Sequence, residues 1–168
     1  MNSRITLRPI APDDMDFLLR VYRSTREEEL GMIVDWNEEM KAAFVLQQFQ
    51  AQHAWYQEHY MGASFDVILV DGVPAGRLYV HRREREIRLV DITLLLEFRT
   101  GGLGTSILRD LMGEAKAAGK PLTIHVEVYN PAMRLYERLG FRPIEERGPY
   151  LLMEWRPPQV KDQLNTAS

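Results

Sequence analysis

Hydrophobic and polar positions along this chain repeat with two periods, and each period predicts one kind of element. Apolar residues at every second position in short runs are typical of strands, and apolar residues three and four positions apart in longer runs predict helices. The first pattern predicts strands at residues 5–8, 64–70, 75–81, 87–96, 122–128, 141–144 and 150–155. The second predicts helices at residues 12–21, 37–60, 103–118 and 130–139, whereas residues 24–36 are expected to be irregular.

The order of these elements is β-α-α-β-β-β-α-β-α-β-β, which predicts the α/β (α+β) class, with a mixed sheet and helices on both faces. Asp71-Gly72 is a tight-turn signal, so the two strands around it are expected to form a hairpin. No internal repeat or linker is visible, and we expect a single domain over residues 1–156. The polar residues 157–168 are expected to form a disordered tail.

Composition narrows the class of protein further. The chain has 168 residues, of which 45% are hydrophobic and 27% charged, as in an ordinary globular domain. A net charge of −3 argues against a nucleic-acid partner, which favours a basic face. The absence of cysteine excludes disulfides, a thiolate nucleophile and cysteine zinc sites. Residues 1–5 lack a signal-peptide core and no run approaches the about 18 apolar residues of a spanning helix, so we expect a cytoplasmic protein with no membrane partner.

A glycine-rich stretch from Arg99 to Thr105 lies between an apolar strand and an amphipathic helix. Such a loop places free backbone N–H groups at the positive end of the helix dipole, where they attract phosphate, and glycine lets the phosphate approach the backbone. The spacing does not fit a dinucleotide fingerprint, because Ile107 stands where a third glycine is needed, nor a P-loop, which requires a lysine. From this stretch alone, a glycine turn that only begins the helix is an equally good interpretation.

Two motifs together resemble the GNAT superfamily of acyl-CoA-dependent N-acyltransferases. One matches that family's Gln/Arg-x-x-Gly-x-Gly/Ala phosphate loop and consists of Arg99-Thr100-Gly101-Gly102-Leu103-Gly104. The other matches its Asn-Pro-Ala…Leu-Tyr-Glu-x-Leu-Gly-Phe segment and consists of Asn130-Pro131-Ala132-Met133-Arg134-Leu135-Tyr136-Glu137-Arg138-Leu139-Gly140-Phe141. The element order over residues 4–155 also fits the family. The resemblance implies a GNAT-like mixed, mostly antiparallel, twisted sheet of six to seven strands.

The same resemblance implies acetyl-CoA (coenzyme A) as co-substrate. Backbone N–H groups of the loop would hold its pyrophosphate, and the backbone of the preceding strand end would pair with the pantetheine arm as an added strand does. One N–H of that strand end would also stabilise the oxyanion formed when an amine attacks the thioester. The cofactor-binding residues expected in this way are Thr93, Leu94, Leu95, Arg99, Thr100, Gly101, Gly102, Leu103, Gly104, Thr105, Asn130, Ala132 and Tyr136.

Tyr136 is also the expected general acid, because a thiolate with a pKa near ~8.5 can take a proton from a nearby phenol with a pKa near ~10. The alternative is an aromatic residue that only packs in the core. A base is needed as well, since an amine with a pKa near ~10 is almost entirely protonated at pH 7. Glu127, Asp91 and His125 are the candidates, although each could be a structural hydrogen-bonded residue and a water chain could replace all three.

We therefore expect an N-acetyltransferase that transfers an acetyl group from acetyl-CoA to a primary amine of a small molecule or peptide, by direct attack in a ternary complex. The alternative is a non-catalytic acyl-CoA-binding regulatory module. A protein that binds ATP or NAD is disfavoured by the missing lysine and third glycine. His53 and His59 cannot share one helix face as a metal pair, so no metal is expected. The acceptor is not identified by the sequence, and a homodimer is a possible assembly.

Overall fold

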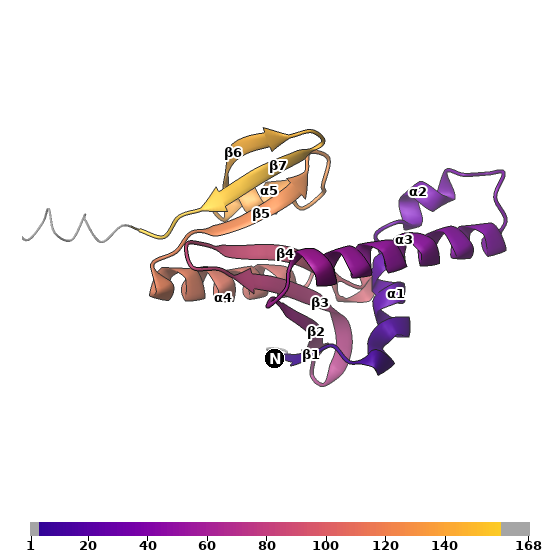
Figure 1. The fold of residues 1–168 in the computed structure, drawn as a ribbon, viewed down its shortest axis with the longest axis horizontal. Helices are drawn as coiled ribbons and strands as arrows, with labels where there is room; N and C mark the ends of the chain where they lie inside the picture. The colour runs from indigo at the N-terminus through magenta and orange to yellow at the C-terminus, as the bar shows by residue number, and fades with distance from the viewer. Residues whose placement is uncertain (1–3, 159–168) are drawn as a thin grey trace, which may run out of the picture. The chain divides into compact units, whose positions relative to one another are not determined.

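The structure is a computed structural model that describes residues 4–158, so residues 159–168 of the expected tail lie outside the described range. Its strands are β1 (Ile5–Pro9), β2 (Ser64–Val70), β3 (Val73–Arg82), β4 (Ile87–Leu94), β5 (Leu122–Glu127), β6 (Arg142–Arg147) and β7 (Tyr150–Trp155). Its α-helices are α1 (Met15–Ser24), α2 (Glu27–Gly31), α3 (Glu38–His59), α4 (Leu103–Ala118) and α5 (Met133–Arg138), and the 3-10 turns are η1 (Pro12–Asp14) and η2 (Leu96–Phe98). The predicted order of strands and helices is thus largely confirmed (Figure 1).

The strands form one seven-stranded sheet in the order β1-β2-β3-β4-β5-β7-β6. β1 is antiparallel to β2, and β7 is antiparallel to both β5 and β6. β4 and β5 are parallel, with Ile87 opposite Leu122 and Leu89 opposite Ile124. A parallel pair requires a crossover connection, and α4 is that connection. The predicted class, a mixed and mostly antiparallel sheet with helices, is confirmed.

The chain divides into two compact units, each of which is built from two segments. Of the described residues, the first unit comprises 4–79 and 91–101, and the second comprises 80–90 and 102–158. Strands β3 and β4 therefore begin in one unit and end in the other. The single domain expected over residues 1–156 stays a prediction.

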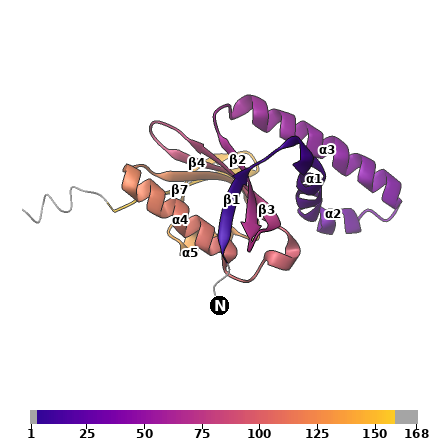
Figure 2. The ribbon, with the colours of Figure 1, turned by 90° about the horizontal axis from the view of Figure 1, so that it is seen from below.

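In the first unit, α1 and α2 lie beside the long helix α3 (Figures 1 and 2). Their shared core is built by Leu18, Tyr22, Leu30, Val45 and Phe49. The prediction that residues 24–36 are irregular was wrong at α2. That segment is helical because Leu30 is buried in this core, and the tertiary contact outweighs the mixed-charge composition.

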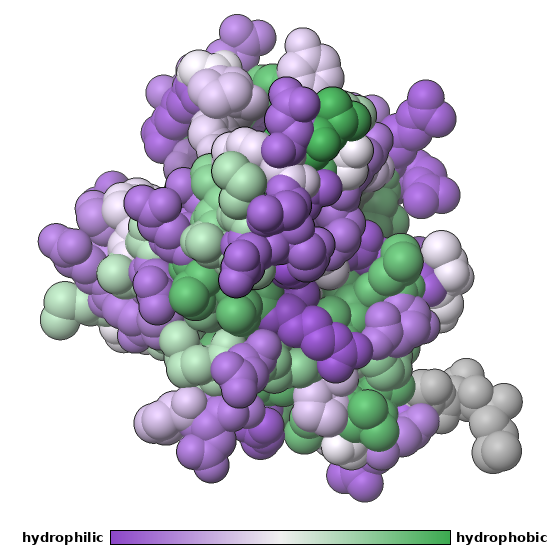
Figure 3. Space-filling view, turned by 90° about the vertical axis from the view of Figure 1, so that its right-hand side faces the viewer, coloured by the Kyte–Doolittle hydropathy of each residue, from purple (hydrophilic) through white to green (hydrophobic). Residues whose placement is uncertain are grey.

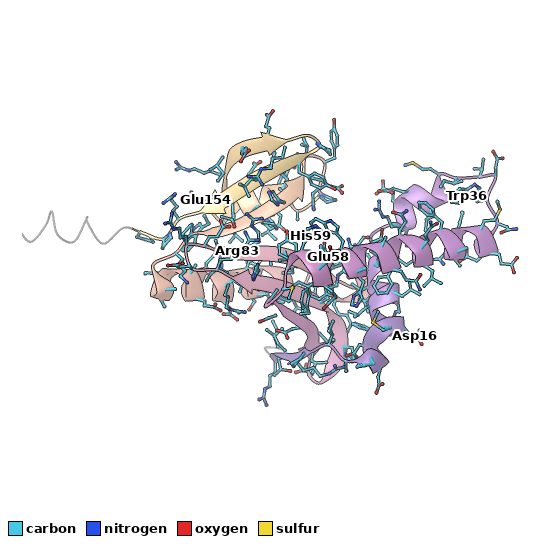
Figure 4. All side chains as sticks on the ribbon, viewed as in Figure 1. Asp16, Trp36, Glu58, His59, Arg83 and Glu154 are labelled. Atoms are coloured by element: carbon cyan, nitrogen blue, oxygen red, sulfur yellow. The ribbon has the colours of Figure 1, made fainter. Side chains whose placement is uncertain are left out.

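Helix α3 begins as its sequence predicts. Asn37 is its N-cap, and the Asn37 side chain accepts a hydrogen bond of 2.8 Å from the Met40 backbone N–H. Just before the cap, Trp36 lies in the loop and packs edge-on against Phe44, and His59 lies at the other end of the helix (Figure 4). The cap and the Trp36 contact fix the beginning of a helix that carries part of the site described below.

Hydrophobic side chains also occur on the surface, among hydrophilic ones (Figure 3). In the first unit, Met32 and Val34 are 73% and 87% exposed although they flank Ile33, which packs against the helical core. Burial in the tertiary structure, rather than hydropathy alone, therefore decides which apolar residues of this segment belong to the core.

The core of the second unit lies between α4 and its strands. α4 buries one face, made of Ile107, Leu108, Leu111 and Ala115. The strands contribute Ile87, Leu89, Leu122, Ile124, Val126 and Met153, all of which are at most 5% exposed. The apolar spacing that predicted α4 thus corresponds to its buried face.

Candidate functional site

Strand β4, which leads into the glycine loop, is shorter than the sequence predicts. β4 ends at Leu94 rather than at residue 96, and residues Leu96–Phe98 form the 3-10 turn η2. Phe98 N–H donates to the Leu95 carbonyl at 2.9 Å, and Arg99 N–H donates to the Leu96 carbonyl at 3.1 Å. This turn lies between the end of the strand and the loop.

The loop itself adopts left-handed backbone conformations at two positions. Thr100 has φ +69° and Gly102 has φ +80°, and Gly102 is the N-cap of α4. In the described residues no side chain caps this helix, so the N–H groups of its first turn, Leu103 to Thr105, have no intrahelical acceptor. N–H groups in this position, at the positive end of the helix dipole, can hold an anion.

Gly101 is informative because the fold does not require glycine there. Its φ is not positive, and a Cβ added to it would meet no described heavy atom within 4 Å. A side chain could therefore be accommodated by the protein, but it would occupy the open space beside the loop. A ligand that approaches the backbone closely is a physical reason for a glycine at this position.

The Arg99 side chain turns back onto its own unit. Its Nε–H donates to the Leu94 carbonyl at 2.8 Å, and Nη2 donates to Ser24 Oγ of α1 at 3.3 Å. The guanidinium thus holds the strand end and α1 together. In this arrangement the anion site of the loop consists of backbone N–H groups.

At the end of β4, successive backbone N–H groups point to opposite edges of the strand. Leu95 N–H donates to the Ala75 carbonyl of β3 at 2.8 Å, so this group is already engaged. Because backbone groups alternate in direction along a strand, Leu94 N–H points to the edge opposite β3. The register of β4 with its other neighbour, β5, covers only residues 87–89. Of the three strand-end residues expected from the sequence, Leu94 is therefore the one whose N–H is directed away from β3.

Asp91 lies in a network of side chains in the first unit. Its Oδ2 accepts hydrogen bonds from Arg77 Nη2 at 2.8 Å and from the Tyr56 hydroxyl at 3.1 Å, and its Oδ1 accepts one from Thr93 Oγ1 at 2.7 Å. Burial and the negative charge of Asp91 raise the pKa of Tyr56, so its hydroxyl stays a hydrogen-bond donor. The structure brings the expected residues Asp91 and Thr93 together.

Sequence reasoning missed three members of this network: Gln52, Tyr56 and Arg77. A signal was present in the sequence, because Arg77 interrupts the otherwise uncharged run from Val73 to Val80. A charged residue within a strand that is buried needs a partner of opposite charge. The partner strand holds such a residue, Asp91, but the pairing of β3 and β4 was needed to connect the two.

In the second unit, His125 lies between two guanidinium groups. Arg88 Nη1 is 3.2 Å from His125 Nδ1, and Arg147 Nη1 is 2.9 Å from His125 Nε2. Partial burial and these two positive charges lower the pKa of His125, so its imidazole is neutral at pH 7. A neutral imidazole has one acceptor nitrogen, which can serve only one of the two arginines at a time. Glu127, two residues further along β5, is exposed.

The second motif forms α5 and the turn before it. Asn130 Oδ1 accepts a hydrogen bond of 2.8 Å from Ala132 N–H, so these two expected residues are brought together and the amide shapes the turn. Tyr136 is 4% exposed, and its ring packs edge-on against Phe141 at a centroid distance of 5.7 Å. The ring of Tyr136 thus packs in the core.

Two further properties concern the described residues only. Between residues 4 and 158, no cluster of His, Asp or Glu side chains has the composition of a metal site. In that same range, none of the helices combines the length and the apolar character that crossing a membrane requires.

Comparisons with known proteins identify the family and the fold of the chain. The model of the acetyltransferase (GNAT) family matches residues 21–141. A search of curated proteins finds no significant match. Solved structures with the same fold include the PaiA N-acetyltransferase of Thermoplasma acidophilum in complex with coenzyme A, at 18% identity and a TM-score of 0.67, covering 91% of this chain and 99% of that one.

Two other structures show the same fold. An acetyltransferase of Thermus thermophilus is 21% identical with a TM-score of 0.64, covering 92% of this chain and 97% of that one. Ard1 of Thermoplasma volcanium is 17% identical with a TM-score of 0.60, covering 92% of this chain and 99% of that one.

Proposed function

Because the chain belongs to the GNAT acetyltransferase family, we propose that it transfers an acetyl group from acetyl-CoA to a primary amine of a small molecule or peptide. The observation that carries this proposal is the N-terminus of α4, where uncapped N–H groups follow a loop with open space at Gly101. The chain has no cysteine to serve as a covalent nucleophile. Direct attack of the amine in a ternary complex is therefore the proposed route.

Binding of acetyl-CoA is assigned to the loop and the strand end. The backbone N–H groups of residues 100–105 would hold the pyrophosphate, and Leu94 N–H would donate to the carbonyl oxygen on which negative charge develops. When bound, acetyl-CoA supplies the activated acyl group as its thioester. Asn130 and Ala132 would support the cofactor from the turn before α5. The fold shared with PaiA, whose structure contains coenzyme A, supports this assignment.

Proton transfer is assigned to side chains of the second unit. Tyr136 would donate its phenolic proton to the departing thiolate. The exposed Glu127 is a side chain that could accept the proton of the amine. His125 would first have to release an arginine from its acceptor nitrogen, and a water chain is the alternative to both. A homodimer and a cytoplasmic location, both expected from the sequence, stay predictions.

The proposal is tested by calorimetric titration of acetyl-CoA into wild type, Gly101→Glu and Gly101→Gln. Wild type is expected to bind in the micromolar range. The glutamate is expected to abolish binding because its carboxylate would repel the pyrophosphate, and the neutral glutamine of the same size should weaken binding less. Gly101 is suited to this test because its backbone accepts a side chain without strain.

A thiol-release assay with a broad panel of primary amines then separates the two functions expected from the sequence. Free thiol formed with at least one amine would support the acetyltransferase. Binding of acetyl-CoA without thiol release from any amine would support a non-catalytic acyl-CoA-binding module. If folded wild type does not bind acetyl-CoA, the proposed function is wrong.

A further inference from the structure

A buried ion pair connects the strand end to the rest of the first unit. The side chains of Arg77 and Asp91 are 3% and 12% exposed, and Arg77 Nη2 lies 2.8 Å from Asp91 Oδ2. The same Nη2 donates to Gln52 Oε1 of α3 at 2.9 Å. One guanidinium therefore joins β3, β4 and α3.

Stability alone does not explain this pair. Removing two charges from water costs about as much as their attraction returns, and a well-packed apolar pair is often equally stable. In addition, Arg77 Nε is buried without an acceptor among the described residues, which adds a further cost. A buried pair of this kind is better explained by the geometry that it imposes.

The geometry that it imposes is that of the strand end. Gly76, next to Arg77, lies so close to β4 that a Cβ there would be 2.1 Å from the Thr93 carbonyl oxygen. Ala75 accepts the Leu95 N–H, and Thr93 Oγ1 donates to the carboxylate that Arg77 holds. Leu94 thus lies between residues that are fixed on both sides by β3 residues 75–77.

We propose that Arg77 is a positioning residue for acyl transfer, which acts through Asp91 to hold Leu94 N–H in the direction of the thioester carbonyl. This inference rests on the proposed function. Asp91 is then the anchor of the strand end and is not the base, because three donors already occupy its oxygens, one of them on a guanidinium. The network assigns Gln52 and Tyr56 the role of holding this anchor against α3.

The first test follows the Leu94 amide in ¹H–¹⁵N spectra of the full chain. In wild type, acetyl-CoA is expected to shift the Leu94 resonance more than coenzyme A does, because only the thioester offers a carbonyl oxygen to this N–H. In Arg77→Met, this difference between the two ligands is expected to disappear, whereas the shifts of Gly102 and Leu103 on binding should remain. An unchanged difference at Leu94 in folded Arg77→Met would overturn the inference.

The second test measures turnover. Arg77→Met is expected to lower kcat by about 10²-fold, the loss expected for a misplacement of about 1 Å, while the Kd for coenzyme A stays unchanged. Arg82→Met on the same strand, which removes a half-exposed guanidinium paired with Glu114, is the matched control and should keep wild-type kcat. Equal kcat values in Arg77→Met and Arg82→Met would show that Arg77 does not position the site.

A variant in which both charges are replaced tests the inference even if the single variant Arg77→Met does not fold. Arg77→Met/Asp91→Asn leaves no unpaired buried charge and keeps an oxygen that can accept from the Tyr56 or Thr93 hydroxyl, so it is expected to fold with a Tm near that of wild type and still to show the loss of kcat. Wild-type kcat in this double variant would contradict the inference. Absence of coenzyme A binding by wild type would be a different failure, since it overturns the proposed function together with this inference.

Discussion

Tyr136 has an observed packing role, and the proposed function gives it a chemical role as well. Its ring is buried against Phe141, which any helix-face aromatic residue could achieve, whereas protonation of a thiolate requires its hydroxyl alone. Removing the hydroxyl while keeping the ring therefore separates the two roles. Phenylalanine makes this change with the least disturbance of the core.

We expect Tyr136→Phe to bind acetyl-CoA like wild type and to lower kcat by about 10²-fold or more, the usual contribution of a general acid. Titration calorimetry and the thiol-release assay measure the two quantities. Wild-type kcat in this variant would assign Tyr136 to the core only.

At the scale of elements, the decisive feature is the close approach of β3 and β4. Gly76 permits it, because any side chain would meet the Thr93 carbonyl oxygen of the neighbouring backbone. The turn η2 then ends the strand after Leu94 and leads into the loop. Strand spacing, strand length and loop entry together determine where the Leu94 N–H points.

Gly76→Ala is expected to lower the free energy of unfolding by about 1–3 kcal/mol, as overpacking of a core usually does, because backbone must move. Gly31→Ala is the matched control, since a Cβ there meets no described atom within 4 Å and its φ is not positive. Urea denaturation measures both variants. Equal stability of the two would show that β3 and β4 separate without cost.

At the scale of the whole molecule, two partly buried histidines couple stability to pH. Burial and the charge of Arg77 lower the pKa of His53, and burial with Arg88 and Arg147 lowers that of His125. The unfolded chain, in which a histidine titrates near ~6.5, therefore binds more protons than the folded chain once the pH falls below that value. These residues contribute stability above pH ~6.5 that is lost as the pH falls.

We expect the urea midpoint to decrease between pH 7 and pH 5, and the decrease to be smaller in His125→Gln than in wild type. The direct check is NMR titration of the imidazole resonances, in which both histidines should titrate below ~6.5. A His125 that titrates above this value would contradict the assigned environment, because it would mean that a carboxylate rather than the arginines dominates the site.

The sequence by itself determined the elements and the family. Period-two and period-3.6 patterns, the Asn37 cap and the glycine loop depend on contacts within a few residues, so they can be read locally, and the two motifs identified the GNAT family. Element boundaries that depend on long-range contacts were not predicted. Burial of Leu30 makes α2 helical, and the turn η2 takes the place of the expected end of β4.

Only the tertiary structure decided which residues meet. The pairing of β3 with β4 brought Arg77 to Asp91 and occupied the carboxylate that the sequence had suggested as a base. The same pairing engaged Leu95 N–H. The alternation of backbone groups along a strand then directs Leu94 N–H to the other edge. These outcomes depend on strand register and on burial, which join residues far apart in the chain. No local pattern of residues contains that information.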